Sequence, residues 1–267
     1  MSKKRILFIT QEMDPYLDLD GIGSLIQKLP ATAQDEGMEI RILMPRFGVI
    51  NERRHRLHEV VRLSGMNIII DDDDYALIIK VASLPGSRIQ VYFLDNDEFF
   101  KRKNVFFDDE GQPIDDNQEK TVFFCKGALE TVRKFGWSPD IVHCHGWMTS
   151  LIPFYLKTAY KNDPILKGAK VIFSVYEKNI DSTFTDEFIK KAAINNLKQD
   201  QLAAFKNGTG INLYKGAIQY ADGIINGSPD LEENIQKSIE ESKKPFLQTE
   251  SEDYLKSYIQ FYKNFIS

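Results

Sequence analysis

The sequence has few cysteines, no long apolar run and no cluster of basic residues. Its two cysteines, Cys125 and Cys144, support neither a disulfide scaffold nor a zinc site made of cysteine alone. The basic residues at positions 3–5 precede an apolar run too short for a signal peptide, and no stretch approaches a membrane span. The formal charge of −5 argues against a nucleic-acid surface. We therefore expect a cytoplasmic protein that has no nucleic-acid or membrane partner.

Enzyme and metal signatures are missing as well. No Gly-x-Gly-x-x-Gly follows the first apolar run, which disfavours a nicotinamide dehydrogenase, and no Gly-x-Ser-x-Gly marks a serine hydrolase. Residues 71–74 are all aspartate, but no glycine or distal glutamate completes a cation loop, so we interpret them as a solvated hairpin turn. Asp18-Leu19-Asp20-Gly21 opens like a calcium loop and lacks the remaining ligands. We expect no metal and no cofactor.

Short apolar runs alternate with helical patterns along most of the chain. Continuous apolar runs between polar turns are typical of parallel strands that are covered on both faces. The alternation predicts an α/β fold with a Rossmann-like, three-layer parallel sheet. The predicted strands are residues 6–9, 40–44, 91–94, 141–143, 171–175 and 223–225, and the predicted helices are residues 25–34, 119–135, 149–160 and 213–220.

Two intervals depart from this alternation. Residues 60–63, 66–70 and 76–81 are closely spaced apolar runs that predict an antiparallel β insertion at about 58–82. Residues 238–250 are rich in Glu, Lys and Ser and form the least globular interval. We expect this interval to separate a domain of residues 1–240 from a final segment, 251–267. The apolar stripe of that segment predicts a helix that packs back on the same domain.

The loop between the first strand and the first helix is the most informative segment. In α/β proteins this turn holds phosphates, because N–H groups at the helix start and nearby glycines form an anion site. Gly21 and Gly23 occupy the glycine positions, but Asp18 and Asp20 share the loop and no basic residue precedes Lys28 in it. Two carboxylates repel a diphosphate. The loop therefore predicts the backbone architecture of a nucleotide-sugar site without the positive charge that such a site needs.

Two histidines stand at the carboxyl end of a predicted strand, the edge that faces the ligand crevice in open α/β sheets. A metal shared by His143 and His145 is one interpretation. We expect instead that these alternate residues point to opposite faces of the strand and do not share an ion. At least one of them then has a structural role.

A set of motifs near the N-terminus points to a known family. It consists of Gln11-Glu-x-x-Pro15-Tyr, Gly21-x-Gly23 and Leu-Pro30. The set resembles bacterial glycogen synthases and plant starch synthases, which typically have Ser-Glu-x-x-Pro-(Phe/Tyr)-x-Lys-Thr-Gly-Gly-Leu-Gly-Asp here. Aligned on the two prolines, the family's lysine falls on Asp18 and its first glycine on Asp20. The resemblance assigns that lysine to the ADP-glucose donor, so its loss implies a degenerate donor loop and disfavours ADP-glucose.

The similarity continues to about residue 235, mainly at scaffold positions. Residues 140–148 resemble the family's Asp-x-Val-His-x-His-Asp-Trp-His, with Gly146 and Met148 in place of Asp and the last His. Tyr176 and Glu177 stand where the family has His and Asn, respectively. With no catalytic residue expected intact, the resemblance implies a vestigial cleft of Asp116, Asn117, His143, His145, Trp147, Tyr176 and Asn212.

The resemblance implies the N-terminal domain of a two-domain GT-B glycosyltransferase. We recognise no second half, which would supply the cations for a donor diphosphate. Residues 254–258 are similar to the helix that returns to the first half in full-length members, which suggests that the middle of an ancestral enzyme was lost.

Two functions follow from the resemblance. The first is a non-catalytic domain that binds a glucan, a sugar, a protein partner or a second copy. It would bind through an exposed cleft face, with Trp147, Met148 and Tyr176 as its apolar floor. The alternative is an active ADP-glucose:α-1,4-glucan glucosyltransferase that is completed by a separate C-terminal half or a partner chain.

Overall fold

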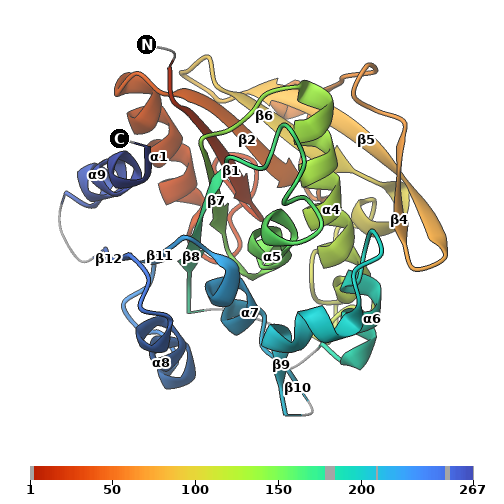
Figure 1. The fold of residues 1–267 in the computed structure, drawn as a ribbon. Helices are drawn as coiled ribbons and strands as arrows, with labels where there is room; N and C mark the ends of the chain where they lie inside the picture. Colours follow the sequence, from red (N-terminus) through yellow and green to blue (C-terminus); the bar gives the residue numbers. More distant parts are fainter. Residues whose placement is uncertain (1–2, 178–183, 209, 250–252, 267) are drawn as a thin grey trace.

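The predicted strands form the middle of one large sheet in the computed structural model, which describes residues 3–177, 184–208, 210–249 and 253–266 (Figure 1). The strands of this sheet are β1 (Arg5–Thr10), β2 (Glu39–Pro45), β3 (His58–Glu59), β4 (Met66–Ile70), β5 (Asp73–Ser83), β6 (Gln90–Asp95), β7 (Ile141–His145), β8 (Lys170–Val175), β11 (Gly223–Asn226) and β12 (Phe246–Gln248). Their order is β12-β11-β8-β7-β1-β2-β6-β5-β3, with β4 paired to β5. The strands from β12 to β6 are parallel, which confirms the predicted α/β fold.

Helices cover both faces of the parallel strands. The helices are α1 (Gly23–Asp35), α2 (Glu52–His55), α3 (Asp97–Phe100), α4 (Asn117–Phe135), α5 (Leu151–Lys157), α6 (Asp186–Ala192), α7 (Leu213–Tyr220), α8 (Glu233–Ser242) and α9 (Tyr254–Ile266), with 3-10 turns η1 (Trp147–Thr149) and η3 (Gln199–Phe205). Helices α1 and α9 lie on one face, and α4, α5 and α7 lie on the other (Figure 1). A small ribbon of β9 (Lys206–Asn207) and β10 (Gly210–Ile211) lies apart from the sheet.

The core lies along the central strands. Phe8 and Ile9 of β1, Ile42 of β2, Val142 of β7 and Ile172 of β8 are all completely buried. Because side chains on both faces of these strands are covered by helices, each strand is a continuous apolar run instead of an alternating one. This is why the sequence pattern locates the parallel strands well.

The β insertion is antiparallel, as predicted, but its first strand was wrongly placed. Residues 60–63 form a turn, closed by a 2.8 Å hydrogen bond from the Leu63 N–H to the Val60 carbonyl, and Val61 is 78% exposed. The short edge strand β3 precedes that turn and pairs with β5. Strands β4 and β5 form a hairpin that turns at Asp71 and Asp72, so the aspartate run is the predicted turn. Strand β5 also pairs antiparallel with β6 and thereby extends the main sheet.

The prediction that residues 238–250 are the least globular interval is wrong. Helix α8 continues through Ser242, with Ile235 and Ile239 buried, and β12 pairs parallel with β11 at the edge of the sheet. A strand of three residues is too short to produce a recognisable apolar run. Helix α8 was missed because most of its residues are polar and its apolar stripe is narrow.

The C-terminal helix α9 packs back on the domain, as predicted. It contacts α1 and β7, and its Tyr258 and Tyr262 side chains are completely buried. At its surface, Lys263 pairs with Glu36 of the α1 C-cap at 2.8 Å. Residues 251, 252 and 267 of the predicted segment lie outside the described residues, and the domain limits at 240 and 251 stay predictions. Within the described part of the chain, no helix is long and apolar enough to cross a membrane.

Candidate functional site at the carboxyl edge of the sheet

The candidate site lies where β1, β7, β8 and β11 end. The strand register places Thr10 beside His145 and His145 beside Ser174, and it places Val175 beside Asn226. Because these strands are parallel and adjacent, the loops that follow them meet at one edge of the sheet. The predicted loop and both predicted histidines are brought together there.

The loop after β1 is held from inside by Glu12. One carboxylate oxygen accepts hydrogen bonds from the N–H groups of Leu19 and of Asp20, the latter at 2.8 Å, and the other accepts from Ile22 at 3.2 Å. The N–H of Gly21 donates to the Asp18 carboxylate at 3.1 Å. The N–H groups of residues 19–22 are thus occupied by the chain's own carboxylates, where a bound anion would need them.

The surroundings of Glu12 also shift the pKa of its carboxyl group. Burial raises the pKa of Glu12 to about 7, against the opposing effect of the hydrogen bonds from the loop N–H groups. The carboxyl group therefore changes charge near neutral pH. In the same loop, Gly21 has a φ of +82°, a conformation that favours glycine. Gly23 begins α1 and packs closely on Asp14 and Asp18, where an added Cβ would lie 3.1 to 3.3 Å from their atoms.

The two histidines face the same side of β7, so the expectation of opposite faces was wrong. Their ring centroids are 3.8 Å apart. Successive residues of a strand point to opposite faces, and residues two apart share a face. His143 Nδ1 lies 2.6 Å from the Tyr262 hydroxyl of α9, and its Nε2 lies 2.8 Å from the Ser174 hydroxyl. Both ring nitrogens are engaged, which gives His143 a structural role.

His145 is held on one side only. Its Nδ1 lies 2.8 Å from the Tyr176 hydroxyl, and its buried Nε2 has no hydrogen-bond partner among the described residues. Burial lowers the pKa of His145 to about 3, and burial beside His145 lowers that of His143 well below its usual value. Both rings are therefore neutral at pH 7. No group of three or more potential metal ligands comes together in the described part of the chain.

The space beside His145 is filled by the chain itself. Gln11 donates from Nε2 to the Asp20 carboxylate at 2.9 Å and accepts the Met148 N–H at 3.3 Å. Gly146 has a φ of +83°, and a Cβ on it would lie 2.5 Å from Gln11 Oε1. The Tyr176 ring covers Gly227 in the same way, since a Cβ there would lie 2.3 Å from Cε1. A larger residue at either glycine would therefore require the Gln11 side chain or the Tyr176 ring to move.

What remains here is a cavity of about 50 Å³, which we name the central cavity. Small-molecule sites usually measure about 300–1,000 Å³. The side chains expected to form an exposed apolar floor are instead buried: Trp147 is 2%, Met148 0% and Tyr176 5% exposed. The central cavity is lined by Gln11, Asp20, Ile22, Gly146, Tyr176, Glu177 and Ser228.

Asp116 and Asn117 support the loop before α4. Asn117 Nδ2 donates to the Phe106 carbonyl at 2.8 Å, while the Asp116 carboxylate pairs with Arg102 and lies 3.3 Å from Lys120 Nζ. Burial lowers the pKa of Lys120 to about 8, although the nearby carboxylate opposes this shift. These groups hold the segment that carries Phe106.

The remaining two predicted residues are Trp147 and Asn212. The Trp147 ring meets the Phe106 ring edge-on, with ring centroids 4.5 Å apart. Asn212 caps α7, where its side-chain oxygen accepts the N–H of Lys215 at 2.7 Å. Asn212 is therefore a structural cap in this chain, whereas Trp147 borders a second, larger cavity.

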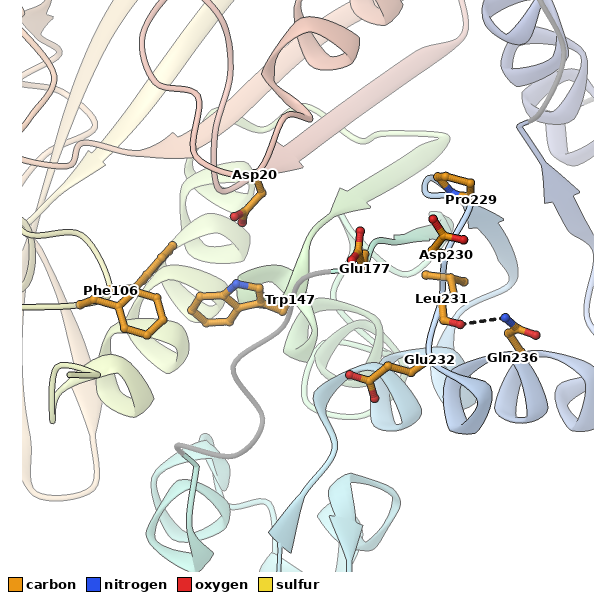
Figure 2. Close-up of a pocket in the computed structure, with 10 residues that line it drawn as sticks. Asp20, Phe106, Trp147, Glu177, Pro229, Asp230, Leu231, Glu232 and Gln236 are labelled. Atoms are coloured by element: carbon orange, nitrogen blue, oxygen red, sulfur yellow. Dashed lines mark hydrogen bonds between the residues drawn. The ribbon is translucent and has the colours of Figure 1, made fainter. Parts of the chain in front are cut away.

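This second cavity, the flank cavity, measures about 570 Å³. Trp147 and Phe106 stand on one side of it, residues 229–232 and Gln236 on the other, and Asp20 points in from the loop after β1 (Figure 2). Its lining holds four carboxylates and no Lys, Arg or His among the described residues. The flank cavity is lined by Asp20, Phe106, Phe107, Trp147, Glu177, Pro229, Asp230, Leu231, Glu232 and Gln236.

Comparison with known proteins identifies the family. The profile of the starch synthase catalytic domain matches residues 5–248. The chain belongs to this family. Glycogen synthases of Chlorobium phaeovibrioides and Chlorobium limicola are 34% and 33% identical to it, over 86% and 91% of this chain and 47% and 51% of their own. The chain thus spans about half the length of the curated relatives it matches.

Solved structures agree on the fold. The catalytic domain of starch synthase IV from Arabidopsis thaliana, bound to ADP and acarbose, superposes with a TM-score of 0.77 at 21% identity. The match covers 92% of this chain and 51% of that one. A sucrose-phosphate synthase from Thermosynechococcus elongatus matches over 98% of both chains, with a TM-score of 0.50 and 10% identity. At these identities the likeness shows the fold alone.

Departures from the family pattern meet in space at the central cavity. Gln11 stands where the pattern has Ser, and Gly146 stands where it has Asp. The Gln11 side chain occupies the space next to Gly146. Sequence reasoning noted Gly146 and missed this pairing, because 135 residues separate the two positions. It also missed Phe106, Phe107 and residues 229–232 as cavity walls, since loop residues carry no periodic signal.

Proposed function

We propose that this chain is a non-catalytic glycogen/starch-synthase-like domain that binds a glucan in the flank cavity. The observation that carries the proposal is the contrast in lining. The central cavity, where the resemblance implies the donor site, has only about 50 Å³ of space between Gln11, Tyr176 and its other lining residues. The flank cavity beside it is large enough for sugar rings and bears aromatic and carboxylate groups.

The charges around both cavities disfavour transfer from ADP-glucose. Departure of a nucleoside diphosphate needs nearby positive groups for the developing charge. The described linings of the two cavities contain carboxylates and no cationic side chain. His145 cannot supply a proton near pH 7, because its pKa lies at about 3.

The same lining suits an uncharged carbohydrate. Sugar rings stack on aromatic faces through their C–H surfaces, and their hydroxyl groups donate hydrogen bonds to carboxylates. Phe106, Phe107 and Trp147 line the cavity, and Phe107 is the exposed one of the three, at 45% against 6% and 2%. Glu177 and Glu232 provide acceptors. The starch synthase IV structure was solved with acarbose and ADP, which is in keeping with carbohydrate binding by this fold.

Calorimetric titration with maltoheptaose and, separately, with ADP-glucose tests the proposal. We expect saturable binding of maltoheptaose and none of ADP-glucose. Phe107→Ala should weaken maltoheptaose binding about tenfold through the lost stacking. Ile69→Ala is the matched control, because Ile69 is also a half-exposed apolar residue (52%) and lies on the distant β4 hairpin. The proposal fails if maltoheptaose gives no heat, or if both variants weaken it equally.

The second tryptophan allows an optical check. Trp147 borders the flank cavity, whereas Trp137 lies beyond the C-terminus of α4 with its Nε1 bonded to Glu39 at 2.7 Å. Trp137→Phe leaves Trp147 as the only tryptophan. Its fluorescence should then change on maltoheptaose binding and remain constant with ADP-glucose.

The alternative function is an active α-1,4-glucan glucosyltransferase that is completed by a separate C-terminal half or a partner chain. The relatives named glycogen synthase are about twice as long as this match, which is the observation that favours it. Micromolar binding of ADP-glucose would support this alternative over the non-catalytic domain. Silence towards both ligands would instead favour a protein partner or a second copy.

A further inference from the structure

One surface of the molecule is basic, contrary to the expectation that basic residues are not clustered. Five of the ten arginines in the sequence are exposed and form no ion pair with any described residue. We name these five the arginine rim: Arg53, Arg54, Arg56, Arg62 and Arg88. The other five each pair with a carboxylate or lie over an aromatic ring: Arg5, Arg41, Arg46, Arg102 and Arg133. The rim arginines thus lack the partners that the others have.

The arginine rim lies around the short edge strand β3. In the antiparallel pairing of β3 with β5, His58 stands opposite Val81. The residues before β3, which include Arg56 and helix α2, therefore run beside the turn between β5 and β6, and that turn carries Arg88. Between residues 53 and 62 the only carboxylate is Glu59. The charges of this region are therefore mostly positive.

Basic groups in this region repel one another. Burial lowers the pKa of His55, and the positive charge of Arg54 acts in the same direction. Burial also lowers the pKa of Arg41 on β2, and repulsion from Arg62 adds to that shift. The arginine rim is therefore a surface of positive potential that attracts a partner with carboxylate groups.

The other end of the same sheet edge is acidic. Strands β3 and β4 pair one after the other with one edge of β5, while its other edge pairs with β6. Strands β4 and β5 run to a hairpin at the side of the molecule (Figure 1), where residues 71–74 are exposed. Asp71 pairs with Lys190 at 2.6 Å. Asp72, Asp73 and Asp74, which we name the aspartate tip, form no ion pair with a described residue.

A partner that fits this edge carries both signs of charge. From Asp73 to Val81, β5 spans roughly 26 Å at about 3.3 Å per residue, so the two charged regions lie along one edge. A nucleic acid or another long polyanion on the arginine rim would extend to the aspartate tip and be repelled there. A second copy of the chain, turned end to end, places its aspartate tip on the rim and its rim on the tip. The two contacts are then identical, as in a two-fold interface.

We propose that two copies of this chain associate along the β3–β4 edge, with the arginine rim of each copy against the aspartate tip of the other. Val61 of the turn after β3 is 78% exposed and Ile69 of β4 is 52% exposed, which adds apolar side chains between the charged ends. The described linings of the flank and central cavities include no residue of the rim or the tip, so this association is independent of the proposed glucan binding.

Salt dependence is the first test of this association. Sedimentation velocity of the full chain should show a dimer in low salt, because exposed ion pairs carry the contact. Raising sodium chloride from about 50 mM to about 500 mM should increase the dissociation constant of the dimer about tenfold, since the added ions screen these charges. A chain that is monomeric in low salt would overturn the proposal, and so would a dimer that salt does not weaken.

Charge reversal tests which surfaces meet. The rim variant Arg53→Glu/Arg54→Glu/Arg56→Glu and the tip variant Asp72→Lys/Asp73→Lys/Asp74→Lys should each be monomeric, because like charges then face each other at both contacts. An equimolar mixture of the two variants should form a dimer again, since both contacts regain opposite charges. The control Lys161→Glu/Lys167→Glu/Lys170→Glu changes the net charge as the rim variant does, at exposed lysines without an ion pair to a described residue, and should dimerise like the wild type.

The remaining outcomes also decide the proposal. Dimers of both variants, with unchanged circular dichroism spectra, would place the interface elsewhere and overturn it. A mixture that stays monomeric would show that the rim and the tip do not face each other. If the chain is monomeric and binds polyglutamate through the rim, the rim serves a different acidic partner, which also overturns the association of two copies.

Discussion

The central cavity and the flank cavity lie at the same edge of the sheet and differ in size and in how their lining side chains are held. The central cavity has about 50 Å³ of space and is walled by side chains that bond to one another. The flank cavity has about 570 Å³, and one of its aromatic side chains, Phe107, is 45% exposed. The difference teaches that the chain's own side chains fill the centre of this sheet edge, while open space remains beside it.

The two regions also differ in how the chain holds them. The centre is held by side chains from segments far apart in sequence, including Tyr262 of the returning helix, which contacts His143 at 2.6 Å. The flank is formed by two surface loops, residues 106–107 and 229–232. We therefore expect substitutions at the centre to change stability strongly, and substitutions at the flank to change binding with little effect on stability.

The largest effect should follow from removing helix α9, whose Tyr262 contacts His143. Tyr258, Ile259, Phe261 and Tyr262 are buried, and burial of each such side chain contributes about 1.5–3 kcal/mol to the free energy of unfolding. Their summed loss is of the order of a whole domain's stability, about 5–15 kcal/mol. Deletion of residues 251–267 should therefore unfold the chain, as measured by circular dichroism and thermal melting.

A surface variant on the same helix is the control for that deletion. Lys263→Ala removes only the half-exposed pair with Glu36 and should cost less than about 1 kcal/mol. If the truncated chain melts cooperatively at the temperature of the intact one, α9 is dispensable. The hypothesis that both ends of an ancestral enzyme were retained around a lost middle would then fail.

The next largest effect should come from returning the family's aspartate to the centre. Gly146→Asp places a Cβ against Gln11 and requires a positive φ of a non-glycine residue, which together should cost about 3–5 kcal/mol. Gln11→Ser relieves the contact but not the backbone strain. In urea unfolding, the double variant should therefore lose less stability than the sum of the single variants. Additive losses would mean that Gln11 and Gly146 are not coupled.

The third effect concerns the carboxylate that holds the loop. The pKa of Glu12 in the folded chain, about 7, lies above its ordinary value of 4.5, so the folded state binds more protons between these values. Its contribution to the free energy of unfolding is complete below pH 4.5 and is lost as the pH rises through 7, a change of up to about 3 kcal/mol. Urea unfolding at several pH values measures it.

Glu12→Gln should flatten that profile between pH 4.5 and 7, while Glu241→Gln on the exposed side of α8 should leave it unchanged. An identical slope in the wild type and in Glu12→Gln would show that another group titrates.

The sequence predicted these two regions unequally, for physical reasons. Buried parallel strands produce continuous apolar runs, so β1, β2, β6, β7, β8 and β11 were located from the pattern alone. The face of His143 and His145 follows from strand periodicity and was nevertheless predicted wrongly. The contact between Gln11 and Gly146 depends on which strands are neighbours, and the flank depends on loops and on the short strand β12. Such features are set by tertiary packing and have no local signal.

The smallest effect on stability should come from substitutions of exposed residues outside the centre, compared with a substitution at the centre itself. Phe107 of the flank cavity and Phe246 of the neighbouring edge strand β12 are 45% and 44% exposed, so truncating either to alanine removes little buried area and should cost at most about 1 kcal/mol. Tyr176→Ala, at 5% exposure, empties the space over Gly227 and removes the partner of His145, and should cost about 3–5 kcal/mol. Thermal melting of the three variants compares them directly. Losses of equal size would contradict the distinction between a centre that holds the fold and a flank that is free to bind a ligand.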